Sequence, residues 1–147
     1  DRRARQQVRL QRALVVGGGV MGAGIAGQLA EKGLRVRLCD VDLAPLARAK
    51  GRLQQELKKR LKRGHLAPHE ATAIQDRLAV GTDWGQLGDT DLWLEAVVED
   101  LAVKQKLMAE AVARGLPATA VLATNTSSLS VTAMASKLPK PGRVVGI

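Results

Sequence analysis

Aromatic side chains and cysteine are nearly absent from this 147-residue chain, which has two tryptophans, no tyrosine, no phenylalanine and one cysteine. A single cysteine, Cys39, excludes an internal disulfide and suits a reducing compartment, so we expect a cytoplasmic protein. Too few aromatic rings are present for nucleic-acid binding by base stacking. No apolar run approaches the roughly 20 residues needed to cross a bilayer, and the arginine-rich start lacks the apolar segment of a secretory signal.

Positive charge dominates the chain, with 23 lysines and arginines against 14 acids, and its distribution is uneven. Five arginines lie within residues 1–12 and eight basic residues within 48–63, whereas 81–100 holds six acids and no base. A basic surface attracts nucleic acid, acidic membranes or phosphorylated ligands, and composition does not choose among them. The basic run at 58–63 is typical of a solvated helix face.

Apolar residues follow strand spacing and helix spacing in turn along the chain. The segments expected to be strands are 10–16, 34–40, 78–80, 92–98, 120–123 and 143–147. The segments expected to be helices are 20–32, 42–64, 70–77, 101–114 and 130–138. Strands that alternate with helices build a parallel sheet covered on both faces. The sequence therefore predicts an α/β fold with a doubly wound, mostly parallel sheet.

The segment 17–22 reads GGGVMG and fits the pattern G-x-G-x-x-G between a predicted strand and a predicted helix. In that pattern Gly17 permits the tight turn and Gly19 lets the backbone approach a pyrophosphate. Gly22 lets the helix pack closely against the strand. The helix N-terminus then offers free N–H groups and a positive dipole end to the phosphates. This context favours a dinucleotide site over a glycine-rich turn of some other α/β protein.

An acid at the end of the second strand is the next requirement of a dinucleotide site, and Asp40 lies 18 residues after Gly22. A carboxylate there accepts hydrogen bonds from the adenosine ribose and repels a 2′-phosphate. The sequence therefore predicts NAD as cofactor in preference to NADP. The alternative is that Asp40 only begins the following turn.

Three longer motifs resemble those of the L-3-hydroxyacyl-CoA dehydrogenases. They are GGGVMGAGIA at 17–26, LEAVVEDLAVKQK at 94–106 and ATNTSSLS at 123–130. The similarity runs from about residue 13 to 147, and 58–85 looks most like the dehydrogenase part of the multifunctional fatty-acid oxidation complex α-subunit. The resemblance implies a Rossmann-like NAD-binding domain of an oxidoreductase that interconverts (S)-3-hydroxyacyl-CoA and 3-oxoacyl-CoA in fatty-acid β-oxidation.

The resemblance also implies roles for individual residues. The Met21 region covers the pyrophosphate, Asp40 holds the ribose, and Lys104 reaches the cofactor from the helix after the fourth strand. Ser127 hydrogen-bonds the reacting oxygen of the substrate and is the implied catalytic residue. The implied cofactor-binding residues are Gly17, Gly19, Val20, Met21, Gly22, Asp40, Ala96, Val97, Val98, Glu99, Lys104, Asn125 and Ser127.

Each of these residues also has an ordinary structural interpretation. Glu99 and Asp100 favour the N-terminus of the following helix through its dipole. Lys104 suits a solvated helix surface, and Ser127 suits a helix cap. Cys39 and the two histidines do not make a metal-binding set, so no metal is expected. The equivalent of the helix expected over 42–64 lies near the CoA phosphates in the resembling family, which makes Lys62 and Arg63 candidate CoA contacts.

The general base of the resembling family is a histidine in a GxHFF motif, and this chain reads Val-Val-Gly-Ile at 144–147. We therefore expect the base, its glutamate partner and the family's C-terminal helical domain to be absent. Residues 1–12 are expected to be a basic connecting segment and 13–147 an NAD-binding domain truncated at its C-terminal end. We expect this chain alone to be monomeric and inactive. Its full-length parent is expected to bind 3-hydroxyacyl-CoA and to be oligomeric or in a complex with a thiolase.

Two other functions remain open at this point. Another NAD-dependent hydroxyacid dehydrogenase of the GxxxMG type shares the glycine loop but lacks the motif at 125–130. A basic module that binds nucleic acid or an acidic surface accounts for the charge but not for the spacing between Gly17 and Asp40. The nucleic-acid alternative is disfavoured because aromatic residues are so few.

Overall fold

The structure is a computed structural model that describes residues 10–125, 131 and 144–147. Its described strands form one six-stranded sheet in the order β3-β2-β1-β4-β5-β6, and every neighbouring pair is parallel. The strands are β1 (Arg12–Val16), β2 (Arg35–Cys39), β3 (Leu78–Gly81), β4 (Leu92–Glu95), β5 (Val121–Thr124) and β6 (Val144–Gly146). This confirms the Rossmann-like, doubly wound fold.

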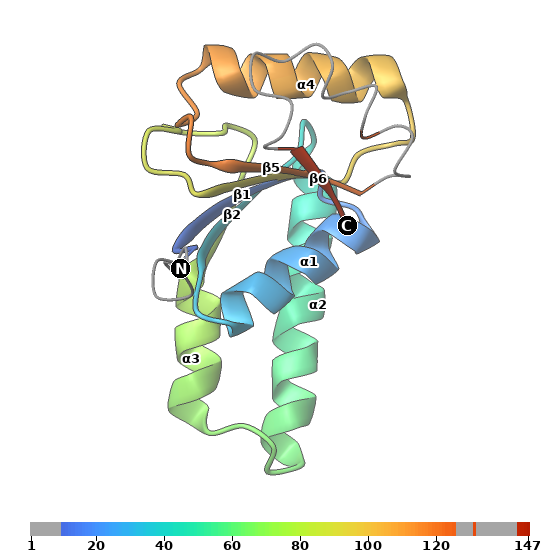
Figure 1. Ribbon diagram of the computed structural model, residues 1–147. Coiled ribbons are helices and arrows are strands. Elements are labelled where there is room, and N and C mark those ends of the chain that lie inside the picture. Colours follow the sequence, from blue (N-terminus) through green and yellow to red (C-terminus); the bar gives the residue numbers. More distant parts are fainter. Residues whose placement is uncertain (1–9, 126–130, 132–143) are drawn as a thin grey trace, which may run out of the picture.

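Helices lie on both sides of the sheet (Figure 1). They are α1 (Val20–Glu31), α2 (Leu43–Lys62), α3 (Pro68–Arg77) and α4 (Leu101–Ala113). Helices α1, α2 and α3 pack on one face and α4 on the other, because the chain crosses to the opposite face where the strand order reverses between β1 and β4. Ligands of doubly wound sheets bind at the carboxyl ends of the strands beside such a reversal.

Alternation along the strands gives each face its own core. Val15, Val36 and Leu38 pack in the cluster beneath α1, α2 and α3. Trp93 and Leu122 belong to the second cluster, beneath α4. Both clusters are apolar and almost fully buried, so the sheet is held from both sides.

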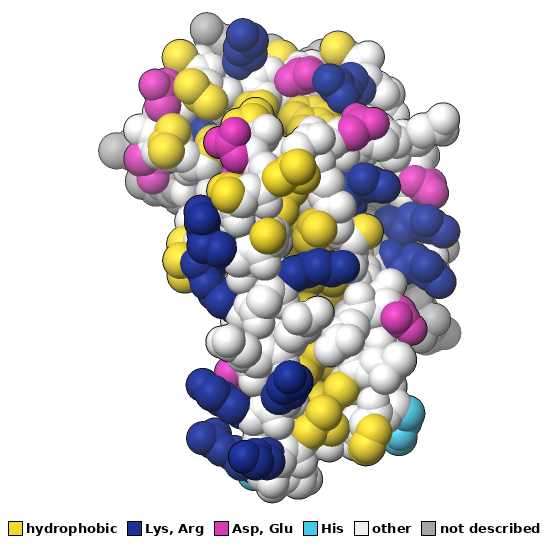
Figure 2. Space-filling view, turned by 180° about the vertical axis from the view of Figure 1, so that it is seen from behind, with side chains coloured by type: hydrophobic (Ala, Val, Ile, Leu, Met, Phe, Trp, Pro, Cys, Tyr) yellow, Lys and Arg dark blue, Asp and Glu magenta, His cyan; other side chains and the backbone are white. Residues whose placement is uncertain are grey.

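The pair α2–α3 extends away from the sheet as a helical hairpin (Figure 1). The buried residues of α2 include Leu46 and Leu57, while the basic run at 58–63 ends the helix and is mostly exposed. Figure 2 shows lysine and arginine side chains spread over this protruding part with hydrophobic ones between them. The basic run is thus largely a solvated helix face, as its pattern indicates.

The prediction of a strand over 92–98 is wrong at its C-terminal end, because β4 ends at Glu95. Its neighbour β1 ends at Val16, and the chain then turns sharply at Gly17, where φ is +114°. The N–H of Ala96 makes the last bond to β1, 2.8 Å from the carbonyl oxygen of Val16. The N–H of Val97 then bonds the Glu95 carboxylate, so the peptides that follow form a loop.

Two other expected helices differ in what the structure describes of them. The helix expected from residue 70 begins at Pro68, because proline fits the first helical turn and the Glu70 carboxylate accepts the N–H of Ala67 at 3.0 Å. The helix expected over 130–138 lies outside the described residues except for Val131. None of the described helices is long and apolar enough to cross a membrane.

Candidate functional site

The turn between β1 and α1 cannot accommodate side chains at two of its glycines. A Cβ on Gly17 would lie 2.6 Å from the carbonyl oxygen of Ala96, and the residue has a left-handed φ of +114°. A Cβ on Gly22 would lie 1.7 Å from the carbonyl oxygen of Gly17. Helix α1 therefore packs directly against the turn, as the sequence pattern predicts.

Gly19 has a different environment, because a Cβ built on it meets nothing within 4 Å. It occupies the N-cap position of α1 and provides no side-chain cap, so the first turn of this 12-residue helix presents its N–H groups outward. Backbone donors and a helix dipole at an open surface are what a pyrophosphate requires. The loop therefore fits the phosphates of NAD.

Asp40 follows β2 and lies against the glycine loop. Its Oδ2 accepts the N–H of Gly18 at 2.7 Å, and its Oδ1 accepts the N–H of Asp42 at 3.2 Å. A Cβ on Gly18 would press on Asp40 Oδ2 and on Leu46, each at 3.2 Å. The middle glycine thus keeps the carboxylate close to the loop, a role that the G-x-G pattern does not assign to it. Asp42 occupies the N-cap position of α2, but its side chain makes no cap hydrogen bond.

Large apolar side chains are exposed where β1, β2 and β4 end. Val20 is 71% exposed, Met21 58%, Val41 88% and Val98 74%. These residues follow three neighbouring strands at the carboxyl edge of the sheet. Exposed apolar side chains grouped in this way are typical of a ligand-binding crevice. They suit the flat rings at the two ends of a dinucleotide.

A buried ion pair lies at the same edge of the sheet. The Lys104 Nζ lies 2.9 Å from both carboxylate oxygens of Glu95, and the two side chains are 1% and 0% exposed. The Thr124 hydroxyl also donates to Glu95. Lys104 Nζ further donates to the backbone carbonyl of Asn125 at 3.4 Å and lies 3.8 Å from Glu99. This cluster joins α4 to the carboxyl ends of β4 and β5.

Sequence reasoning missed Glu95. The signal was present, because Glu95 is the one charged residue in the apolar run 92–98, and an unpaired buried charge is costly. Its partner lies nine residues later, on a helix that the pattern places on the surface. Lys104, expected either to reach the cofactor or to be solvated, is buried with its Nζ on Glu95.

The other predicted residues occupy the loop after β4 and the end of β5. Ala96, Val97, Val98 and Glu99 lie between β4 and α4, next to the glycine turn through the Ala96 carbonyl. Asn125 follows β5, and its N–H donates to the carbonyl of Glu95 at 3.2 Å. Ser127 lies outside the described residues.

The structural interpretation of Asp100, a residue at the N-terminus of a helix, is confirmed. Its Oδ1 accepts the N–H of Val103 at 3.2 Å and caps α4. Cys39 is buried, and its Sγ donates to the carbonyl of Asp83 at 3.2 Å. Burial raises the pKa of the Cys39 thiol to about 11, with Arg37 lowering it and Asp83 raising it by lesser amounts. Such a thiol is a packing residue rather than a nucleophile. The described residues include no His, Cys, Asp or Glu cluster that would hold a metal.

Comparison with known proteins agrees with this geometry. Residues 12–147 match the family described as "3-hydroxyacyl-CoA dehydrogenase, NAD binding domain". A 3-hydroxyadipyl-CoA dehydrogenase of Escherichia coli is 39% identical over 140 residues, which are 95% of this chain and 29% of that protein. A fatty acid oxidation complex subunit alpha of Psychrobacter is 35% identical over 139 residues, covering 94% of this chain and 19% of that subunit.

Solved structures show the same similarity. The crystal structure of a 3-hydroxybutyryl-CoA dehydrogenase from Escherichia coli superposes with a TM-score of 0.87 at 39% identity, covering 95% of this chain and 29% of that one. The chain therefore spans less than a third of the length of the curated relatives described above. The similarity concerns the nucleotide-binding part of longer proteins.

Proposed function

The chain belongs to the NAD-binding domain family of the 3-hydroxyacyl-CoA dehydrogenases, and we propose that it supplies the cofactor half of an enzyme that interconverts (S)-3-hydroxyacyl-CoA and 3-oxoacyl-CoA. The observation that carries the proposal is that the glycine turn, Asp40 and the loop after β4 lie together at the carboxyl edge of the sheet. Family membership over 12–147 also disfavours the two alternatives, a different hydroxyacid dehydrogenase and a basic binding module.

Bound NAD would supply the hydride acceptor. The chain's own residues bind and orient the cofactor: the N–H groups at the start of α1 receive the phosphates, and Asp40 accepts the ribose hydroxyls. The loop at 96–99 would hold the nicotinamide half. The Glu95–Lys104 pair fixes that loop through the N–H of Val97 and fixes the β5 end through the carbonyl of Asn125.

Ser127 is the residue of this chain that we assign to the substrate. In the sequence it comes three residues after Thr124, the last residue of β5, and the reacting groups of doubly wound folds meet at the carboxyl ends of the strands. Its hydroxyl donates a hydrogen bond to the C3 oxygen of the substrate. The proton acceptor for the hydroxyl group is assigned to the histidine of the family's GxHFF motif.

The family also suggests the partners, the compartment and the CoA contacts of the full-length parent. Relatives named as subunits of a fatty acid oxidation complex support a parent that works with other subunits. We propose a thiolase as one of those subunits. We assign it to the cytoplasm, which suits a chain whose one cysteine is a buried free thiol. Lys62 and Arg63, at the end of α2, are the proposed contacts of the CoA phosphates.

Cofactor preference provides the test. NADH and NADPH are titrated separately into the chain, and binding is followed by the fluorescence of the reduced nicotinamide. We expect NADH to bind more tightly. Asp40→Ala removes an ionic acceptor worth about 1.5–3 kcal/mol, so NADH affinity should fall more than tenfold. The difference in affinity between NADH and NADPH should become smaller.

Asp42→Ala is the matched control, because it removes an exposed carboxylate two residues away whose side chain caps nothing. This variant should bind both cofactors as the unmodified chain does. Equal affinity of the unmodified chain for NADH and NADPH, or an equal effect of the two substitutions, would contradict the assignment of Asp40.

A further inference from the structure

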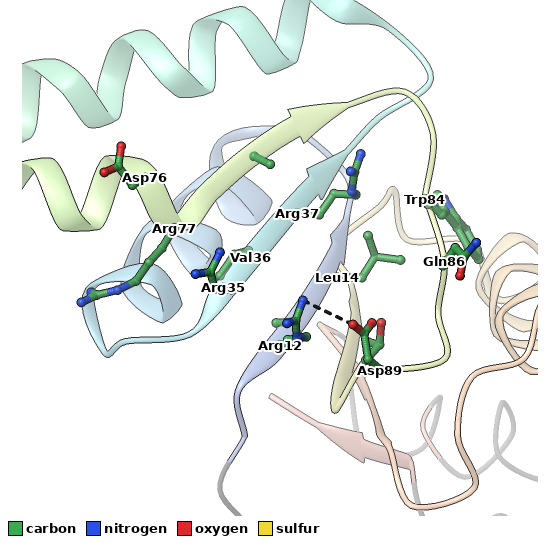
Figure 3. A pocket seen from close by; sticks show the side chains of 14 residues that line it. Arg12, Leu14, Arg35, Val36, Arg37, Asp76, Arg77, Trp84, Gln86 and Asp89 are labelled. Atoms are coloured by element: carbon green, nitrogen blue, oxygen red, sulfur yellow. Dashed lines mark ion pairs between the residues drawn. The ribbon is translucent and has the colours of Figure 1, made fainter.

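The second face of the sheet is unevenly covered. Helix α4 lies over the β4–β5–β6 side, whereas the described part of the chain places only the loop at 82–91 over the β1–β2–β3 side (Figure 1). Parallel sheets normally have both faces buried beneath helices. Here Arg35 and Arg37 occupy this face of β2, and a pocket of about 390 Å³ remains open beside them (Figure 3).

Arginines from neighbouring strands meet in this pocket. Arg12 of β1 and Arg35 of β2 are register partners, and Arg37 lies two residues further along the same face of β2. Adjacent strands are about 4.8 Å apart, so like charges at paired positions repel each other. With Arg77, Asp76 and Asp89, the lining contains four arginines and two aspartates, which leaves a net charge of +2.

These guanidinium groups are only partly neutralised. Arg12 Nη1 lies 3.3 Å from Asp89 Oδ2, but both side chains are more than half exposed, and such pairs are weak. Arg37 donates to a backbone carbonyl, that of Asp83, at 3.3 Å. The Arg35 side chain forms no hydrogen bond or ion pair with any described residue. The pocket therefore has donors available for an anion.

Its other walls suit a small organic molecule. Leu14 forms part of the floor, and Trp84 lines one side, packed against Trp93 with a centroid distance of 5.8 Å. The volume of about 390 Å³ lies within the usual range for small-molecule sites, roughly 300–1,000 Å³. Cationic donors beside an apolar wall select a ligand with one charged end.

The pocket is separate from the dinucleotide crevice. Arg12 and Arg35 begin their strands, whereas the glycine loop and Asp40 follow the ends of the same strands. Four steps along a strand span roughly 13 Å, so Arg12 and Arg35 lie at the edge of the sheet opposite the glycine loop. A ligand in the arginine pocket does not occupy the pyrophosphate position.

We propose that this pocket binds a small phosphorylated molecule whose phosphate group lies between Arg12 and Arg35. A phosphate monoester carries a charge of about −1.5 to −2 at pH 7, which matches the net charge of the lining. Guanidinium forks bind phosphate oxygens through paired hydrogen bonds, and the exposed Asp89 yields its weak contact with Arg12 to the incoming anion.

Calorimetric titration with glycerol 3-phosphate tests the proposal on the chain itself, with and without saturating NAD. We expect one binding site that persists in the presence of NAD. Arg35→Gln should weaken the binding at least tenfold, because it removes charge-assisted hydrogen bonds to the phosphate. The same variant should bind NADH as the unmodified chain does, which separates this proposal from the proposed function.

Arg48→Gln on α2 is the matched control, since it removes the same charge from an exposed position outside the pocket. Arg12→Gln provides a second pocket variant if Arg35→Gln folds poorly. Loss of binding when NAD is added would overturn the proposal in favour of the glycine loop. Equal weakening by Arg35→Gln and Arg48→Gln, no binding at about 10 mM, or tighter binding of polyglutamate than of the phosphate ester would also overturn it.

Discussion

The glycines at the start of α1 differ in what they tolerate. Gly22 faces the carbonyl oxygen of Gly17 so closely that no side chain fits, whereas Gly24, one half-turn later, faces open space. Both residues lie inside the same helix, where alanine is intrinsically preferred to glycine. Steric contact and helix propensity therefore act in opposite directions at these two positions.

Gly22→Ala should destabilise the fold, because its Cβ would lie 1.7 Å from a backbone oxygen and α1 would have to move off the turn. We expect the free energy of unfolding, measured in urea, to fall by several kcal/mol, within the range of severe point substitutions of about 4–5 kcal/mol. NADH binding should be lost with it.

Gly24→Ala is the control and should raise the free energy of unfolding by roughly 0.5–1 kcal/mol, since it adds helix propensity without a contact. A Gly22→Ala variant as stable as Gly24→Ala would show that the turn does not hold α1 as tightly as the structure describes.

At the scale of elements, α4 is attached to the sheet by the Glu95–Lys104 pair as well as by apolar packing. Both charges are removed from water, so each depends on the other for compensation. Truncating one partner leaves the other charge buried. Replacing both partners with apolar side chains of similar volume leaves an apolar contact instead. The pair thus stabilises one arrangement of α4 and the loop before it.

Glu95→Ala should lower the free energy of unfolding by about 3–5 kcal/mol, because the buried Lys104 would lose its close carboxylate partner and keep only the exposed Glu99 at 3.8 Å. The double variant Glu95→Leu with Lys104→Met should recover much of that loss. A double-mutant cycle by urea denaturation measures the coupling between the two side chains.

Glu95→Gln keeps the acceptor for the Val97 N–H and provides a milder member of the series. If the losses from single substitutions at Glu95 and Lys104 simply add in the double variant, the two side chains are not energetically coupled.

The pattern of elements was predictable because strand and helix periodicities are local properties, and all six strands were expected near their observed positions. The predicted strand over 92–98 is too long for a nonlocal reason. The chain turns at Gly17, so residues 96–98 have no neighbouring β1 residues to pair with. The partners of Glu95 lie on a helix and on another strand, so no local pattern identifies them. The prediction of the cofactor-binding residues rests on the glycine spacing and on the resemblance to the dehydrogenase family.

At the scale of the whole molecule, the role proposed for Ser127 predicts a kinetic effect. Ser127→Ala in the full-length parent should lower kcat on the order of 10²-fold, by analogy with the loss of one oxyanion donor. Negative charge develops on the substrate C3 oxygen as hydride arrives, so a donor there acts mainly on the transition state. NADH affinity should change little.

Steady-state kinetics and a melting temperature are measured on the same Ser127 variant. A helix cap would cost about 1 kcal/mol of stability and leave kcat nearly intact. A destabilised but fully active enzyme would therefore assign Ser127 a structural role instead.

The strand order also has a consequence for synthesis of the protein. The central strand β1 pairs with β4 on one side, and the Asp91 carboxylate that receives the N–H of Gln11 is 80 residues away. At roughly 5–20 residues per second, the nascent β1 waits about 4–16 s for that partner. Throughout that interval it is an apolar edge strand that another chain can join. Arg12, at its first position, places a positive charge at the start of this edge, where a charge opposes pairing with a second copy.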